Sequence, residues 1–433
     1  MPDVVIIGGG QAGLSASVCL AQQDIDHVVL EKDDVGASWR HQRWDSFCLV
    51  TPNWTVRLPG QHYNGPDPNG FMSGQAYIDS LVRYAKDFKI PLRRPIEVTR
   101  ASPTSAGWEL ETIAGPVNGR ALIIATSNYQ TPTLPPFASG LSSNILSMSA
   151  AEYRSAGQLP PGRVLVVGSA QSGSQIVEDL QIARRDVILS VSRAGRVPRR
   201  YRGRDAIDWM NQIGFLDRPA TVLDDPRKRF GGEPHMTGRN GGHTISLQNF
   251  HAQGVRLVGR VDGVEGMVLH LKSDLRKNIH AADQFSATFC SDVDAFIEKT
   301  GLNAPLDGDE PSHAPVTSLD RYEEPTRLDL VDEDVSTVIW ATGFSFDYSW
   351  INADVFDPCG YPITMRGETE VPGLYFLGLN YLHNRKSGII YGVGEDAKHV
   401  AVRIRRFLGG SGVLASTSGS PIRSSPVENS NSR

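Results

Sequence analysis

Two glycine-rich segments with the same spacing are the places where chemistry is most readily built in this sequence. The first, residues 8–13, reads Gly-Gly-Gly-Gln-Ala-Gly; it follows a β-branched run and opens a segment with helical spacing. Glycines so placed make a tight turn and let a pyrophosphate approach the backbone at a helix N-terminus, while an acid ending the next strand accepts from a ribose hydroxyl. The segment predicts a dinucleotide site formed by Gly8, Gly9, Gly10, Gln11, Ala12, Gly13, Glu31 and Lys32.

The second segment, residues 168–173, repeats the spacing with alanine at the middle position. The apolar run after it ends in Ser192-Arg193 instead of an acid. An acid there would repel a 2′-phosphate, whereas arginine pairs with it, so the pattern favours NADPH over NADH. Six arginines follow within residues 193–204; some are expected to be solvated, and Arg193 is the first candidate and Arg200 the second. The predicted site comprises Gly168, Ser169, Ala170, Gln171, Ser172, Gly173, Arg193 and Arg200.

The strand after the first glycine loop ends in an acid, and the strand after the second ends in an arginine. The simplest explanation is that the first site binds FAD and the second binds NADPH, with hydride passing between them. Ser38, Trp39 and Arg40 are expected to wall the pyrophosphate and flavin, although core tryptophans beside surface arginines are the alternative. Asn53, in a loop, carries an uncharged amide that can hydrogen-bond a flavin-bound oxygen or the nicotinamide. Further expected contacts, most of them directly after apolar strands, are Trp54, Ala125, Thr126, Thr342, Gly343, Gly378 and Leu379.

The elements that must position these residues form a repeated βαβ pattern. Strands are predicted at 3–7 and 27–31 around a helix at 14–23, and again at 163–167 and 187–192 around a helix at 176–183. Further strands are expected at 121–126, 337–343 and 373–378, and a helix at 395–407. The fold class is therefore α/β with two Rossmann-like domains for FAD and NADPH, the FAD domain being discontinuous. Its expected parts are 1–155 and 331–408, with an NADPH domain at 156–330 and a disordered serine-rich tail at 409–433.

The composition narrows the functional classes. The length of 433 residues predicts two or three domains, and the net charge of −5 argues against a dedicated nucleic-acid binder. The four cysteines form no C-x-x-C pair, and neither H-E-x-x-H nor G-x-S-x-G occurs, so no disulfide framework, metal site or serine nucleophile is expected. His235, His243 and His251 are expected to be ordinary polar histidines. Without a continuous apolar span, the chain is expected to be cytoplasmic and free of membranes. The glycines of 231–242 have no assignment.

These motifs together resemble the class B flavoprotein monooxygenases over about residues 3–407. The resemblance rests on 8–13, Gly-x-x-Trp-Arg at 36–40, 168–173, Ala-Thr-Gly-Phe at 341–344 and the strand at 373–378. The residues from Arg43 to Asn53 look like a bacterial branch of flavin-dependent oxidoreductases. The resemblance implies that NADPH reduces FAD, that NADP⁺ stays bound, and that O₂ forms a C4a-(hydro)peroxyflavin, which Asn53 helps to shield and which oxygenates a small molecule at nitrogen or sulfur.

Three departures from the family pattern keep alternatives open. Residues 146–153 lack the expected histidine, 125–127 read Ala-Thr-Ser without the glycine, and Ala170 replaces a glycine; the first weakens a Baeyer–Villiger assignment most. The alternatives are a flavin oxidase or reductase that makes hydrogen peroxide or reduces an acceptor, and a non-catalytic FAD/NADP(H) redox sensor. The expected partners are a small-molecule substrate and O₂, with a homodimer as one option. The substrate is expected to be chosen by residues near the flavin from 200–330 and 381–391.

Overall fold

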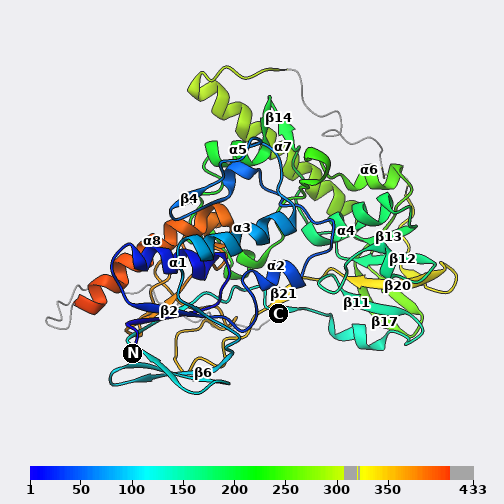
Figure 1. Cartoon of the computed structure of the whole chain (residues 1–433). Coiled ribbons are helices and arrows are strands. Elements are labelled where there is room, and N and C mark those ends of the chain that lie inside the picture. Colours follow the sequence, from blue (N-terminus) through cyan, green and yellow to red (C-terminus); the bar gives the residue numbers. More distant parts are fainter. Residues whose placement is uncertain (307–318, 320–321, 410–433) are drawn as a thin grey trace, which may run out of the picture.

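The computed structural model describes residues 1–306, 319 and 322–409. The first sheet has the order β22-β9-β1-β2-β5, and every adjacent pair is parallel (Figure 1). Strands β1 (Val4–Ile7), β2 (His27–Leu30) and β9 (Ala121–Ile124) are buried at every position, as parallel strands covered on both faces must be. The edges of the sheet are β5 (Leu92–Arg93) and β22 (Leu374–Phe376).

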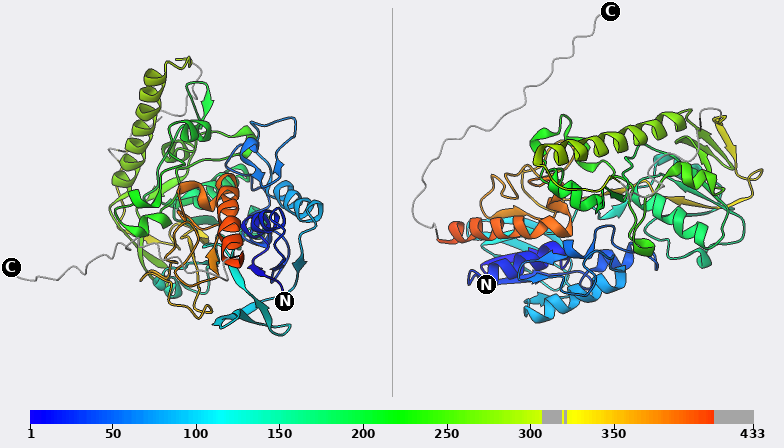
Figure 2. Two further views of the ribbon diagram at one scale, coloured as in Figure 1. Left: turned by 90° about the vertical axis from the view of Figure 1, so that its left-hand side faces the viewer. Right: turned by 90° about the horizontal axis from the view of Figure 1, so that it is seen from above.

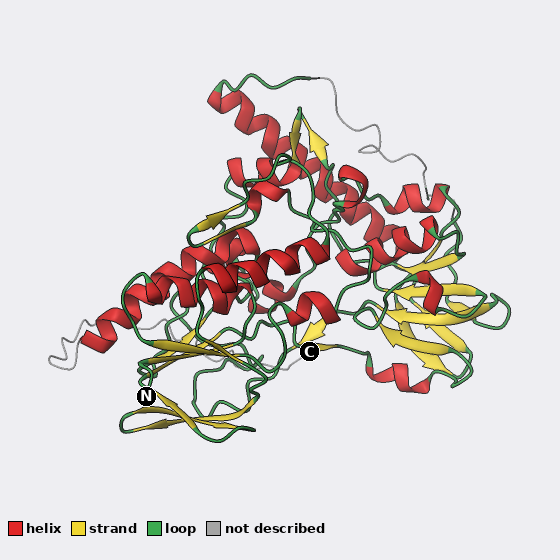
Figure 3. Ribbon diagram, in the orientation of Figure 1, coloured by secondary structure: helices red, strands yellow, loops and turns green. Residues whose placement is uncertain are grey.

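Helices cover one face of this sheet and an antiparallel meander lies on the other (Figures 1 and 3). Helix α1 (Gln11–Ala21) packs against α8 (Ile390–Gly409) and α3 (Gly74–Asp87), although the sequence predicted α8 to begin only at 395. The hydroxyl of Ser73 caps α3 by accepting from Ala76 N. The meander consists of β6 (Val98–Thr104), β7 (Gly107–Thr112) and β8 (Val117–Gly119).

The second sheet repeats this plan with the order β11-β20-β12-β13-β16, all parallel. Its strands are β11 (Leu146–Ser149), β20 (Val335–Trp340), β12 (Arg163–Val167), β13 (Val187–Ser190) and β16 (Arg256–Val258). Helix α4 (Gln171–Ile182) packs on β12 and β13. A second meander packs on the sheet through its leucines; it comprises β17 (Val261–Glu265), β18 (Val268–Leu271) and β19 (Arg327–Asp329). The predicted α/β class with two Rossmann-like domains is confirmed.

The sheets divide the chain differently from the predicted boundaries at 155/156 and 330/331. Strands β11 and β20, which the sequence assigned to the first domain, both belong to the second sheet. The reason is register: β20 lies between β11 and β12, with Thr337 opposite Leu146 on one side and Val164 on the other. The chain therefore leaves the first sheet after β9 and returns at β22. The two crossing segments pair with each other as β10 (Thr131–Pro132) and β21 (Phe344–Ser345).

The stretch 200–330, which the sequence left unassigned, supplies most of a third layer. It contains the hairpin β14 (Arg200–Tyr201) and β15 (Arg204–Asp205), and the helices α5 (Ala206–Gln212), α6 (Leu247–Ala252) and α7 (Leu275–Thr300). Figure 2 shows α7 running across the top of the molecule. The remaining elements are α2 (Ala37–His41), β3 (Arg57–Leu58) and β4 (Gln61–His62).

The predicted tail at 409–433 lies outside the described residues except for Gly409. Within the described part of the chain, no helix combines the length and apolar character needed to cross a membrane.

Candidate functional site

The first glycine loop has the internal geometry of a dinucleotide cradle. Gly8 has φ +111°, and a Cβ there would lie 2.6 Å from Ala125 O; a Cβ on Gly13 would lie 1.9 Å from Gly8 O. These two glycines are required by packing of the loop against β9 and α1. A Cβ on Gly10, by contrast, would meet no described atom within 4 Å. The open space at Gly10 lies at the N-terminus of α1, where a phosphate group fits.

Glu31 lies directly beneath this loop. Its Oε2 accepts from Gly9 N at 2.5 Å, and its Oε1 accepts from Asp33 N at 2.9 Å. The predicted ribose-binding acid is thus at the loop, while the neighbouring Lys32 is exposed. A hydroxyl donor of a bound ribose can share the carboxylate, because each oxygen has more than one lone pair.

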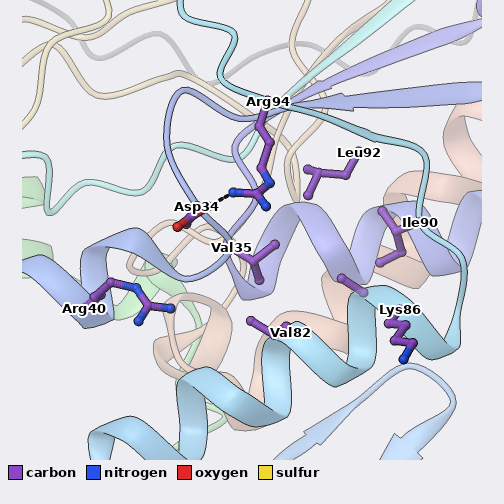
Figure 4. A pocket seen from close by; sticks show the side chains of 9 residues that line it. Asp34, Val35, Arg40, Val82, Lys86, Ile90, Leu92 and Arg94 are labelled. Atoms are coloured by element: carbon purple, nitrogen blue, oxygen red, sulfur yellow. Dashed lines mark ion pairs between the residues drawn. The ribbon is translucent and has the colours of Figure 1, made fainter.

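Of the three residues that the sequence predicted around the cofactor, Trp39 contacts the loop directly. Trp39 Nε1 donates to Gln11 Oε1 at 2.9 Å, and its ring packs edge-on against Tyr77. Ser38 is exposed. Arg40 lines a surface cavity of about 410 Å³ between α2, α3 and β5, where Arg94 pairs with Asp34 (Figure 4). None of residues 8–13 lines that cavity.

The carboxyl ends of β9 and β22 meet beside the same loop. A Cβ on Gly378 would lie 2.6 Å from the Ala12 side chain, which places residues after β22 against α1. Leu379, a predicted cofactor contact, is instead fully buried in the apolar core. Three polar residues here were missed: Asn128 Oδ1 accepts from Asn380 N at 3.2 Å, and Asn380 Nδ2 donates to Tyr129 OH at 2.7 Å. Their signal is that all follow parallel strands at the ligand-binding edge.

The second glycine loop reproduces the first. A Cβ on Gly168 would lie 2.5 Å from Ala341 O, and one on Gly173 would lie 1.9 Å from Gly168 O. Ala170 is the N-cap of α4 with φ −68°, a conformation that accommodates a methyl group. Next to this loop, Thr342 Oγ1 donates to Thr133 O, and Gly343 has φ +93°.

The two candidate arginines differ. Arg193 is exposed, just beyond β13, where a ligand can reach it. Arg200 donates to the carbonyl oxygens of Gly241 and Gly242, both at 2.8 Å, so its guanidinium helps to hold the glycine-rich segment. Arg193 stays the first candidate as a prediction, whereas Arg200 has an internal role.

Asn53 occupies a buried position with one polar atom unsatisfied. It opens a short 3-10 turn after Pro52, and its N donates to Gly70 O at 2.9 Å. Its Nδ2 donates to Asp67 O at 2.9 Å, and a carbonyl oxygen can only accept, so the orientation of the amide is fixed. Asn53 Oδ1 is buried and has no hydrogen-bond partner among the described residues. An unmade bond of this kind costs about 1–3 kcal/mol, so a bound donor is expected there.

Residues 200–330 and 381–391, which the sequence predicted to select the substrate, contact each other. Lys386 N donates to Leu216 O at 3.1 Å, and Ala220 N donates to His383 O at 3.2 Å. Beneath them an apolar cluster joins α5 and α7 to Trp54, whose ring packs edge-on against Tyr391 with centroids 5.4 Å apart. This layer therefore contacts the loop that carries Asn53.

The three evenly spaced histidines have separate environments. His243 Nε2 lies 2.8 Å from Glu178 Oε1, and His251 Nδ1 lies 3.3 Å from Val255 O. His235 is 1% exposed, contrary to the expectation of an ordinary polar histidine, and burial lowers its pKa to about 4. In the described residues no three His, Cys, Asp or Glu side chains are grouped so as to hold a metal ion.

The cradles fit dinucleotides on these observations, and comparison with known proteins agrees. The profile of the family described as pyridine nucleotide-disulphide oxidoreductase matches residues 5–202. A CzcO-like oxidoreductase of Geobacillus kaustophilus is 31% identical over 402 residues, covering 92% of this chain and 97% of that protein. Indole-3-pyruvate monooxygenase YUCCA1 of Oryza sativa is 30% identical over 184 residues, covering 42% of this chain and 45% of that protein.

Solved structures show the same fold at lower identity. A flavin-containing monooxygenase from Stenotrophomonas maltophilia superposes with a TM-score of 0.64 at 18% identity, covering 94% of this chain and 99% of that one. The ornithine N-hydroxylase of Kutzneria sp. 744, with reduced FAD, NADP⁺ and ornithine, gives 0.60 at 14% identity, covering 94% and 99%. Because the Geobacillus kaustophilus relative is 31% identical and is aligned with 92% of the chain, the chain belongs to the CzcO-like oxidoreductases.

Proposed function

We propose that this protein is an NADPH-dependent FAD monooxygenase that oxygenates a small molecule at nitrogen or sulfur. FAD held at residues 8–13 and Glu31 would take a hydride from the coenzyme and then supply an electrophilic oxygen derived from O₂. NADPH would bind at residues 168–173, with Arg193 pairing with its 2′-phosphate. The small-molecule substrate would enter from the layer formed by 200–306 and 381–391.

The observation that carries the proposal is the unsatisfied Oδ1 of buried Asn53. Because Asp67 O fixes the Nδ2 side of this amide, the oxygen side can only accept, and it suits an N–H or O–H donor of bound flavin or nicotinamide. Burial keeps bulk water away from that position, and the acceptor would hold a bound donor in place; an oxygenase needs both in order to delay release of peroxide. The names of an N-hydroxylase and of an indole-3-pyruvate monooxygenase among similar proteins support the same reaction class.

A stopped-flow experiment tests the proposal. FAD-loaded protein is reduced anaerobically with NADPH and then mixed with O₂ while the flavin spectrum is recorded. We expect a long-lived species that is neither reduced nor oxidised flavin. Direct return to oxidised flavin with stoichiometric hydrogen peroxide would instead identify an oxidase. Failure of NADPH to bleach the flavin would contradict both enzyme assignments and leave a non-catalytic redox sensor as the remaining alternative.

A further inference from the structure

The glycine-rich segment 231–242, which the sequence could not assign, packs on the second glycine loop through His235. The ring Nε2 of His235 lies 2.5 Å from Ser169 O. A carbonyl oxygen only accepts, so Nε2 carries the hydrogen and donates it, which leaves Nδ1 unprotonated in the neutral ring. Nδ1 is buried and has no hydrogen-bond partner among the described residues. The ring therefore makes a single directed contact, and that contact is to the loop.

The main chain of His235 holds the segment that carries the arginines. His235 N donates to Gly195 O at 2.9 Å, and His235 forms an isolated parallel bridge with Arg196. One residue thus contacts the glycine loop through its side chain and the arginine segment through its backbone. The two are brought together only by the fold, because His235 lies about forty residues further along the chain.

Ser169 completes the connection from the opposite side. Its Oγ accepts from Ser192 N at 3.0 Å and donates to Ser192 O at 3.1 Å, and Ser192 directly precedes Arg193. Next to it, Gln171 Oε1 accepts from Met236 N at 3.1 Å while Gln171 Nε2 donates to Met236 O. The loop, the arginine segment and residues 235–236 therefore form a closed set of hydrogen bonds with fixed mutual positions.

The pyrophosphate is common to NADPH and NADH, and only the 2′-phosphate separates them. Discrimination therefore depends on where Arg193 lies relative to the loop that binds the shared part. An exposed arginine side chain loses rotamer entropy when it pairs with a phosphate. The pairing is therefore strong only when its backbone is held at the right distance.

We propose that His235 is a positioning residue for coenzyme specificity: by fixing the loop at 168–173 against the segment that begins at Arg193, it sets the preference for NADPH over NADH. This inference rests on the proposed function only in requiring that this loop bind a pyridine nucleotide. It assigns no part in the oxygen chemistry to His235.

The test measures dissociation constants of NADP⁺ and NAD⁺ for FAD-loaded protein by calorimetry, with the ratio of the two as the readout. His235→Leu removes the donor and is expected to reduce the preference for NADP⁺ about tenfold. His235→Gln keeps an N–H donor of similar reach and is expected to leave the preference unchanged. Ser169→Ala breaks the link to Ser192 without touching the buried ring, and it should reduce the preference even where the leucine variant does not fold.

Arg193→Ala supplies the decisive comparison. If His235 acts through Arg193, the double variant with His235→Leu has the same coenzyme ratio as Arg193→Ala alone. The inference is overturned if the two losses multiply, or if His235→Leu and Ser169→Ala weaken both coenzymes equally. If Arg193→Ala alone leaves the ratio at its wild-type value, the coenzyme assignment itself is contradicted. A missing oxygen-reacted species would contradict the monooxygenase proposal and leave the binding ratios standing.

Discussion

Two buried side chains, Asn53 and His235, are each left with one unsatisfied nitrogen or oxygen atom, but for different reasons. Asn53 Oδ1 has no partner among the described residues, and the proposed function assigns it a donor on a bound group. The imidazole ring of His235 donates from Nε2 to Ser169 O, and this hydrogen bond fixes the ring with Nδ1 in a buried position that has no partner among the described residues. Burial is the largest cause of the lowered pKa of His235, Arg196 lowers it further, and the bond to Ser169 O opposes both. Arg196 is itself paired with Asp283.

This pKa predicts a pH dependence of stability. The ring is neutral in the folded protein down to about pH 4, whereas in the unfolded chain it takes up a proton below its ordinary 6.5. Between these values the unfolded state binds the extra proton, so lowering the pH through this window destabilises the fold. His235→Gln removes the effect and should lose about 2 kcal/mol less stability than wild type between pH 7 and pH 5. Urea unfolding at both pH values measures it; equal losses in the two proteins would contradict the assignment.

At the scale of the elements, the two strand–loop–helix units have the same arrangement, in which some glycines are required by packing and the middle one is not. Gly13 and Gly173 are required because a Cβ would strike the carbonyl oxygen of the loop's first glycine. At the middle position the first loop has Gly10 and the second has Ala170, and both have extended backbone. The middle glycine is therefore not needed by the fold, and we expect that in the first loop it leaves room for a ligand.

This division of duties predicts opposite outcomes for two alanine variants. Gly13→Ala forces a Cβ to within 1.9 Å of Gly8 O and should destabilise the protein by about 1–3 kcal/mol or more. Gly10→Ala should change stability by less than about 0.5 kcal/mol and yet reduce bound flavin. Thermal melting of the flavin-free proteins and flavin absorbance per mole of protein give the two readouts. If Gly10→Ala retains full flavin, the pyrophosphate does not approach the helix there.

At the scale of the whole molecule, the glycine-rich segment 231–242 links the second domain to the part of the first domain that carries Asn53. A Cβ on Gly238 would lie 2.0 Å from Leu49 O, so only glycine permits this approach. Asp179 on α4 accepts from Ser46 Oγ at 2.5 Å, from Tyr153 OH at 2.6 Å and from Arg239 at 2.6 Å. These contacts join Ser46 of the first domain, the connection between β11 and β12, and the glycine-rich segment around one carboxylate.

The sequence predicted the parts whose signal is local. Both βαβ units were found because a glycine loop between a β-branched run and a helical pattern is contained within about thirty residues. The assignment of β20 failed because an apolar strand fits either of two similar sheets, and long-range pairing decides between them. Residues 231–242 could not be assigned because two of their glycines, Gly238 and Gly242, lie against Leu49 and Phe71, which are far away in the chain. Asn53 was predicted as a site residue and stays a prediction; the direction of its amide could not be predicted, because it depends on the hydrogen bond to Asp67 O.

The lifetime of the oxygen-reacted flavin in Asn53→Ala, compared with wild type, tests the central claim most directly. Asn69→Ala is the matched control, because Asn69 is exposed in the segment between β4 and α3 that also carries Asp67, the hydrogen-bond partner of Asn53. Each protein is reduced with NADPH, mixed with O₂, and followed by its spectrum and by peroxide release. Loss of one buried hydrogen bond of about 1–2 kcal/mol predicts a species that decays about tenfold faster in Asn53→Ala, with Asn69→Ala unchanged. Equal lifetimes in all three proteins, or no such species in wild type, would contradict the account.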